Sequence, residues 1–152
     1  MNIRLEPVTK ENWEEVLKLK VHAHQEKFVP LPAESLAVAY IKPWDEAVDP
    51  YAIYVDKTMA GLYYLSYTPG SPDNYWIGGF IIDKNYQGKG YGKAALMAIL
   101  KQIKQLHPNC RVAKLTVEKD NDMAQKLYKG LGFSDTGKTN KYDEIIYELP
   151  VE

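Results

Sequence analysis

Residues 80–100 read FIIDKNYQGKGYGKAALMAIL, and this stretch decides the fold. An apolar run typical of a buried strand leads into Gly88, Gly90 and Gly92, and apolar residues at helical spacing follow them. Glycine loses more conformational entropy on folding than any other residue. Three glycines at the start of a helix therefore predict either a plain turn or a loop whose backbone a ligand approaches closely.

The elements on both sides of this stretch predict an α+β fold. We expect a mixed, mostly antiparallel twisted sheet flanked by helices, with one strand–helix–strand crossover that makes a central pair of strands parallel. Strands are predicted over residues 2–8, 51–67 (two strands joined at Asp56–Lys57), 74–83, 111–118 and 141–149. Helices are predicted over residues 9–21 (capped by Thr9), 32–42, 90–106 and 120–133 (closed by Gly132). The first helix would present an apolar face made of Trp13, Val16, Leu17, Leu19 and Val21.

Composition places the chain among soluble globular proteins. Its 152 residues suit a single domain, and 45% of them are apolar and 26% charged. The 19 basic and 20 acidic side chains leave a net charge of −1, which does not favour nucleic acid as a partner. The first residues contain no signal-like apolar segment, and no apolar run is long enough to suggest a membrane span. With Cys110 as the only cysteine, these features predict a reducing, cytoplasmic setting.

Two known phosphate-binding patterns fit the glycine stretch poorly. A P-loop requires Ser or Thr after its Gly-Lys pair, but the pair at 92–93 is followed by Ala94. The dinucleotide pattern GxGxxG/A does match residues 90–95, and Glu118 ends the next strand, where an acidic residue could hold a ribose. However, several residues separate the strand from the glycines, and only about 60 residues follow them, too few for the second half of a doubly wound sheet.

A third pattern, Gln/Arg-x-x-Gly-x-Gly/Ala, is filled by Gln87, Gly90 and Gly92. Here the sequence resembles the GNAT family, the Gcn5-related, acetyl-CoA-dependent N-acetyltransferases. The resemblance extends through VEKDNDMAQKLYKGLGF (117–133), and the two motifs cover about the last half of the chain in the family's order and spacing. The segment HQEKFVPLPAESLAVAY (24–40) resembles the bacterial spermine/spermidine acetyltransferase branch.

The resemblance implies an acetyl-CoA site at the glycine stretch. A helix N-terminus offers unpaired N–H donors and a positive dipole end to a pyrophosphate, and glycine lets that backbone approach the phosphates. The residues implied in coenzyme binding are Phe80, Ile81, Ile82, Gln87, Gly88, Lys89, Gly90, Tyr91, Gly92, Lys93, Asn121 and Lys126. The alternatives are a glycine-rich turn without a ligand, an N-cap role for Asn121, and solvated surface lysines.

Two further features bear on the chemistry. Glycines at 78 and 79 inside a strand indicate a bulge, and the family resemblance implies that this bulge splays the strand from its parallel neighbour to admit the pantetheine arm. A backbone N–H near Phe80 would then polarise the thioester carbonyl. Tyr128 matches the family's tyrosine that protonates the departing thiolate; the alternative is that its ring only packs on an apolar helix face.

The base that would deprotonate the amine is harder to predict. An alkylamine is neutral in about one molecule in 2,500 at pH 7, so a base or a water chain would help. The family often uses a glutamate on the strand before the loop, but that strand has only Asp83. Glu26 is the remaining candidate, with a solvated surface role as its alternative. His22 and His24 are expected on a helix, as surface or packing residues, at a spacing that does not put both on one helical face, and no cluster predicts a metal.

The sequence therefore predicts an N-acetyltransferase whose partner is a small-molecule amine. The branch resemblance implies a polyamine such as spermidine or spermine, attacked directly in a ternary complex. An aminoglycoside or peptide amine is an alternative acceptor, and a noncatalytic acyl-CoA binding module is the alternative of another class. The resemblance also allows a homodimer.

Overall fold

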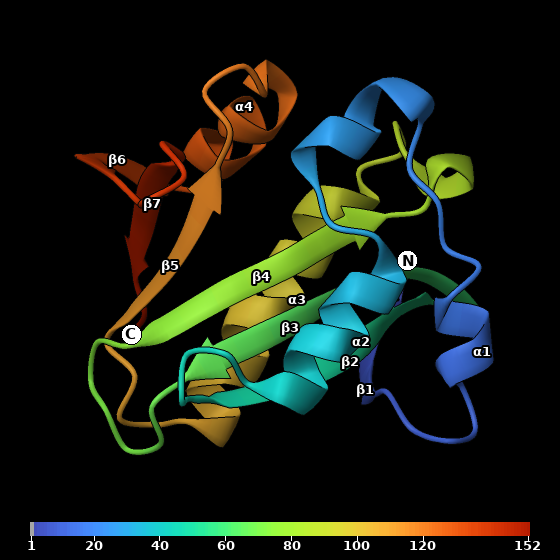
Figure 1. Cartoon of the computed structure of the whole chain (residues 1–152), viewed down its shortest axis with the longest axis horizontal. Coiled ribbons are helices and arrows are strands. Elements are labelled where there is room, and N and C mark those ends of the chain that lie inside the picture. The colour runs from blue at the N-terminus through green and yellow to red at the C-terminus, as the bar shows by residue number, and fades with distance from the viewer. Residues whose placement is uncertain (1) are drawn as a thin grey trace.

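The structure, a computed structural model, describes residues 2–152 and contains one seven-stranded sheet (Figure 1). The strands lie in the order β1-β2-β3-β4-β5-β7-β6. They are β1 (Ile3–Pro7), β2 (Ala47–Val55), β3 (Thr58–Tyr67), β4 (Tyr75–Ile82), β5 (Val112–Val117), β6 (Ser134–Thr139) and β7 (Ile145–Pro150). The β4–β5 pair is parallel and the other neighbours are antiparallel, which confirms the predicted α+β fold.

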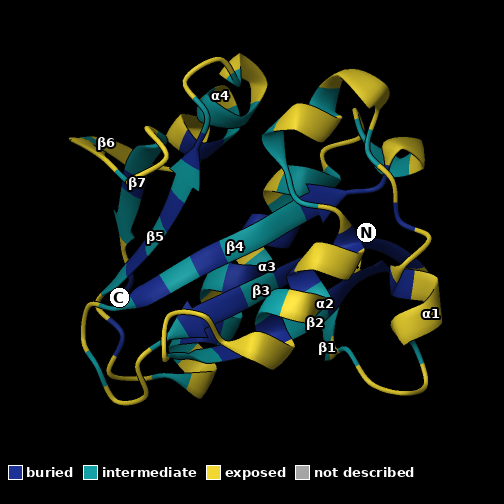
Figure 2. Cartoon of the chain, viewed as in Figure 1, coloured by how far each residue is buried: buried dark blue, intermediate teal, exposed yellow. Residues whose placement is uncertain are grey.

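Helices cover both faces of the sheet. They are α1 (Trp13–Val16), α2 (Pro32–Ile41), α3 (Tyr91–Leu106) and α4 (Asp122–Gly130), with two 3₁₀ helices, η1 (Ala23–Phe28) and η2 (Lys84–Tyr86). The apolar stripe of α3 packs with one face of the sheet in the larger core, and α1 and α2 lie on the opposite face (Figure 1). Buried residues are concentrated in the central strands (Figure 2). None of the helices in residues 2–152 combines the length and the apolar character needed to cross a membrane.

The parallel strands β4 and β5 separate soon after they begin. Their recorded pairing is Trp76 with Lys114, near the start of both strands, and beyond it the two strands diverge (Figure 1). The antiparallel pairs on either side, β3–β4 and β5–β7, by contrast, are paired over most of their length. The edge of β4 from Gly78 onward is therefore not bonded to β5, as the predicted splay requires.

The bulge predicted in β4 is confirmed. Tyr64 pairs with Gly78 and Leu62 with Ile81, so two residues of β4 lie opposite Tyr63. Steric crowding also explains why both positions are glycine. A β-carbon on Gly78 would lie 2.3 Å from the Tyr64 ring, and one on Gly79, whose φ is +60°, would lie 2.5 Å from the Ser35 hydroxyl. Bound ligand is therefore not needed to explain glycine at these two positions.

The first predicted helix is wrong in its length and its cap. α1 ends at Val16, its N-cap is Asn12 instead of Thr9, and η1 forms a separate element further on. The cause lies in the tertiary structure: the carboxylate of Asp83 accepts the backbone N–H of Lys20 at 2.9 Å, and the Lys20 carbonyl accepts the N–H of Lys84 at 2.7 Å. These bonds hold the chain in a non-helical path beside the end of β4.

Replacing Gly78 by alanine tests the packing at the bulge. The added methyl group would overlap the Tyr64 ring, and overpacking of this kind costs about 1–3 kcal/mol. We expect urea unfolding to show a loss of that size in the free energy of unfolding. Gly130→Ala is the matched control, because its β-carbon would meet no atom within 4 Å and α4 should gain about 0.4–1 kcal/mol. Equal effects of the two substitutions would contradict the proposed overlap.

Candidate active site

A cleft of about 620 Å³ opens where β4 and β5 diverge. Three parts of the chain contribute to its lining. They are the segment 21–29, the end of β4 with the loop of residues 87–92 (the glycine loop), and α4 with its N-cap. The predicted coenzyme residues among its lining are Phe80, Ile81, Ile82, Gln87, Gly88, Gly90, Gly92, Lys93 and Asn121, and Tyr128 lines it as well. Residues far apart in the sequence are thus brought to one cavity.

The glycine loop has the shape of an anion cradle. Gly88 and Gly90 adopt φ values of +76° and +83°, which L-residues rarely adopt, and Gly90 is the N-cap of the 16-residue helix α3. A β-carbon on either glycine would meet no atom within 4 Å, so the backbone faces open space in the cleft. The first N–H groups of a helix have no intrahelical acceptor and lie at its positive end. The loop therefore fits a phosphate group.

Three of the predicted coenzyme residues lie outside the lining of the cleft. Lys89 places its Nζ 5.9 Å from the centre of the Tyr86 ring, and the ring of Tyr91 lies 6.4 Å from that same ring. Lys126 is exposed on α4. Gln87 lines the cleft, but its side-chain amide bonds to Gln25 and to the Ile82 carbonyl.

Tyr128 combines burial with access to the cleft. Its side chain is 8% exposed, and its ring lies 5.9 Å from that of Phe133 and 6.3 Å from that of Tyr147. Burial disfavours the charged phenolate and raises the pKa of Tyr128 to about 12. The phenol therefore keeps its proton at neutral pH and can act as a donor.

Asn121 caps α4, because its Oδ1 accepts the backbone N–H of Ala124 at 3.2 Å. Since the residue also lines the cleft, the N-cap role and a ligand contact are compatible: the cap uses the amide oxygen, and the side-chain NH₂ is a separate donor.

Neither acidic side chain considered as the general base is well placed to deprotonate an amine in the cleft. The two oxygens of Asp83 accept the backbone N–H groups of Lys20 and Asn85 at 2.9 and 3.0 Å, so this buried carboxylate organises the backbone. Glu26 is exposed and is not among the residues that line the cleft. His22 and His24 are exposed, as expected, but both line the cleft and their rings stack with centres 5.8 Å apart.

The expected separation of the two histidines was wrong because His22 precedes η1 in an extended conformation and is not helical. No group of three or more His, Cys, Asp or Glu side chains in residues 2–152 is arranged to hold a metal.

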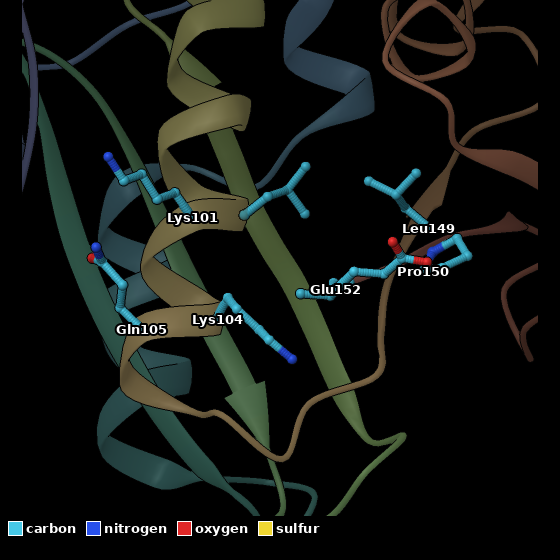
Figure 3. Close-up of a pocket in the computed structure, with 8 residues that line it drawn as sticks. Lys101, Lys104, Gln105, Leu149, Pro150 and Glu152 are labelled. Carbon is cyan, nitrogen blue, oxygen red and sulfur yellow. The ribbon is translucent and has the colours of Figure 1, made fainter.

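A second cavity, of about 320 Å³, lies away from this cleft. It is formed by α3 on one side and the end of β7 on the other, with Lys104, Gln105 and Leu149 among its residues (Figure 3). None of the predicted site residues lines it.

Comparison with known sequences agrees with this geometry. Residues 13–133 match the acetyltransferase (GNAT) family. The chain belongs to the GNAT family. GNAT proteins are enzymes that use acetyl-CoA, and the glycine loop and the splayed strands lie within the matched residues.

The curated relatives of this GNAT chain include the spermine/spermidine N(1)-acetyltransferase of Bacillus subtilis strain 168. The two are 29% identical over 147 residues, which cover 91% of each chain. A second relative, from Bacillus subtilis subsp. natto, is a probable spermine N(1)-acetyltransferase with the same identity and coverage.

Solved structures show the same fold at lower identity. Spermidine N-acetyltransferase from Vibrio cholerae, in complex with CoA and spermine, has a TM-score of 0.73 and 16% identity over 98% of this chain and 95% of that one. The aminoglycoside acetyltransferase AAC(6')-Ib, in complex with coenzyme A, has a TM-score of 0.79 and 15% identity over 98% and 95% of the two chains. These likenesses establish the fold of the GNAT chain and leave its acceptor open.

The buried phenol of Tyr128 gives a prediction for titration. With tyrosine ring carbons labelled, NMR should show Tyr128 still protonated at about pH 10, the reference midpoint of tyrosine in model peptides, because burial raises the pKa of Tyr128 to about 12. The Tyr128→Phe variant identifies the resonance. Since the pKa is higher in the folded than in the unfolded chain, its contribution to stability is complete below pH 10 and is lost as the pH rises through about 12. A midpoint for Tyr128 at the model-peptide value near pH 10 would contradict this assignment.

Proposed function

We propose that this GNAT protein transfers the acetyl group of acetyl-CoA to a primary amine of a small polycation, such as spermidine or spermine. One observation supports the proposal above the others: the free edge of β4, the N-terminus of α3 and the Tyr128 side chain all line a single cleft. The β4 edge would bind the arm that carries the thioester, the N-terminus of α3 would bind the pyrophosphate, and Tyr128 would protonate the departing thiolate.

The features of this cleft suggest one direction for the bound coenzyme. The N–H groups at the start of α3 and the open backbone of Gly88 and Gly90 would bind the pyrophosphate, with Lys93 beside them. The pantetheine arm would follow Phe80–Ile82, whose edge is not paired with β5. The backbone N–H near Phe80 would then donate to the thioester carbonyl oxygen as it gains negative charge.

Tyr128 would serve as the general acid. The amine nitrogen attacks the carbonyl carbon, the carbon–sulfur bond breaks, and the phenol of Tyr128 gives its proton to the departing sulfur. The proton lost by the amine must leave through the cleft on the other side. His22 and His24 line that side, whereas Glu26, the base proposed from sequence, does not. A route through the histidines or through water is therefore favoured over direct transfer to Glu26.

An aromatic and acidic surface beside the bulge supports a cationic acceptor. The Tyr64 ring lies against Gly78 and Gly79, and the Trp44 ring stacks with it at 6.5 Å. Ser66 follows Tyr64 by two residues in β3, so both side chains lie on the same face of the sheet. The Ser66 hydroxyl donates a hydrogen bond to the carboxylate of Glu46 at 3.3 Å. Burial, and then the negative charge of Glu144, raise the pKa of Tyr64, so a second carboxylate acts on this surface. Aromatic faces and carboxylates both attract ammonium groups.

The acceptor is tested by measuring thiol release from acetyl-CoA with a panel of amines. We expect turnover with spermidine and spermine above that with diamines, aminoglycosides and short peptides, because several ammonium groups can meet the Trp44–Tyr64 surface and its acids. Turnover confined to an aminoglycoside or a peptide would replace the polyamine assignment. Binding of acetyl-CoA without turnover of any amine would favour a noncatalytic acyl-CoA binding module.

Replacing Tyr128 by phenylalanine separates chemistry from binding. The ring stays and the proton donor is lost, so we expect kcat to fall by about 10²-fold or more, the usual scale of general acid catalysis. Titration calorimetry should give an unchanged Kd for coenzyme A. The control is Tyr40→Phe, because this hydroxyl lies on α2 in a residue that is 82% exposed. Full activity in the Tyr128→Phe variant would rule out the acid role.

A further inference from the structure

One pair of side-chain amides connects the two sides of the cleft. Gln25 Nε2 donates to Gln87 Oε1, and Gln87 Nε2 donates back to Gln25 Oε1, both at 2.9 Å. Gln87 Nε2 also donates to the Ile82 carbonyl at 2.8 Å, and Gln25 Oε1 accepts the backbone N–H of His22 at 3.1 Å. The four bonds run without a break from His22, on one side of the cleft, to the end of β4 on the other.

These bonds occupy the Gln87 side chain. A primary amide has two N–H donors, and in Gln87 one bonds to Gln25 and the other to Ile82. The side chain can therefore donate to a phosphate only by breaking one of these bonds. The glutamine of the glycine motif contacts the neighbouring segment instead, although the sequence pattern alone points to the coenzyme.

Polar links tie the segment that contains Gln25 to the turn after β4, in addition to the packing of Val21 and Val29 on the smaller core. We call residues 21–29 the acceptor-side segment, because they line the cleft opposite the glycine loop and α4. It contains η1, and a 3₁₀ helix has poorer hydrogen-bond geometry than an α-helix. The other link beside it joins Lys20 to Asp83 and Lys84. Both links end on residues 82–87, which continue directly into Gly88.

We propose that Gln25 is a positioning residue for acetyl transfer. Through its amide pair with Gln87, the loop that holds the coenzyme also fixes the acceptor-side segment, so bound coenzyme raises the affinity for the amine. When the coenzyme binds, it orders the glycine loop and, through the amide pair, the acceptor-side segment. The segment then has less conformational freedom to lose when the amine binds. By linkage, the amine raises the affinity for the coenzyme by the same factor. This inference rests on the proposed acetyl transfer.

The test substitutes Gln25 by methionine, which keeps the length of the side chain and removes the amide. With spermine as the acceptor, we expect KM for the amine to rise about five- to tenfold, the scale of a lost buried hydrogen-bonded pair. The Kd of coenzyme A, measured by calorimetry without amine, should stay within about twofold. The increase in amine affinity caused by coenzyme A should disappear. Gln105→Met, the same change on the exposed side of α3 at the second cavity, is the matched control and should alter none of these values.

The same measurements distinguish positioning from a purely structural role. Loss of folded enzyme would lower kcat and leave KM and Kd unchanged. Gln87→Met should raise the amine KM by a similar factor, and the double variant no further, because both substitutions remove one pair. Should Gln25→Met fail to fold, Gln87→Met carries the same test from the other side of the pair, and an unchanged amine KM in that folded variant overturns the inference.

An unchanged amine KM in a folded Gln25 variant, with an active wild-type chain, overturns this inference alone. A wild-type chain that acetylates no amine overturns the proposed function and the inference with it.

Discussion

The divergence of β4 from β5 is the constraint on which the rest of this structure depends. Parallel strands ordinarily bond along their whole length, but here the recorded pairing is Trp76 with Lys114. Backbone groups beyond it require another partner, because an unpaired buried N–H or C=O is costly. The cleft lets water or a ligand supply that partner. The bulge opposite Tyr63 turns β4, and α3 and α4, which flank β5 in the sequence, place their N-terminal ends at the opening.

The turn that follows β4 connects this cleft to the rest of the chain. Asp83 uses both carboxylate oxygens on backbone N–H groups, one in its own turn and one from Lys20. The Gln87 side chain bonds to Gln25, far earlier in the sequence, and to the carbonyl of nearby Ile82. A short polar segment thus fixes the start of the glycine loop and the path of residues 20–28 at the same time. The two sides of the cleft are built from segments about 60 residues apart in the sequence, and these hydrogen bonds connect them directly.

Six of the seven strands and the glycine loop could be predicted because their signals are local, whereas β6 has no apolar alternation and was not predicted by range. Alternating apolar residues, the turn at Asp56 and the glycines before α3 each determine a conformation within a few residues. The length of α1, the stacked histidines and the Gln25–Gln87 pair could not be predicted, since each depends on residues that only the folded chain brings together. Three residues predicted to bind the coenzyme do not line the cleft. The side chains of Lys89 and Tyr91 lie near the Tyr86 ring, and Lys126 is exposed on α4. A sequence motif gives the position of a residue in the chain but not the direction of its side chain.

For Tyr128, packing and catalysis are not competing explanations. The apolar face of α4 buries the ring against Phe133 and Tyr147, as a structural role requires. The same burial raises the pKa of the phenol to about 12, so the group remains protonated until a strongly basic atom appears beside it. In the proposed reaction that atom would be the departing thiolate, whose negative charge would form beside the apolar residues around Tyr128. Burial would therefore keep the proton on Tyr128 until the carbon–sulfur bond breaks, and its transfer to sulfur would neutralise the charge that forms there.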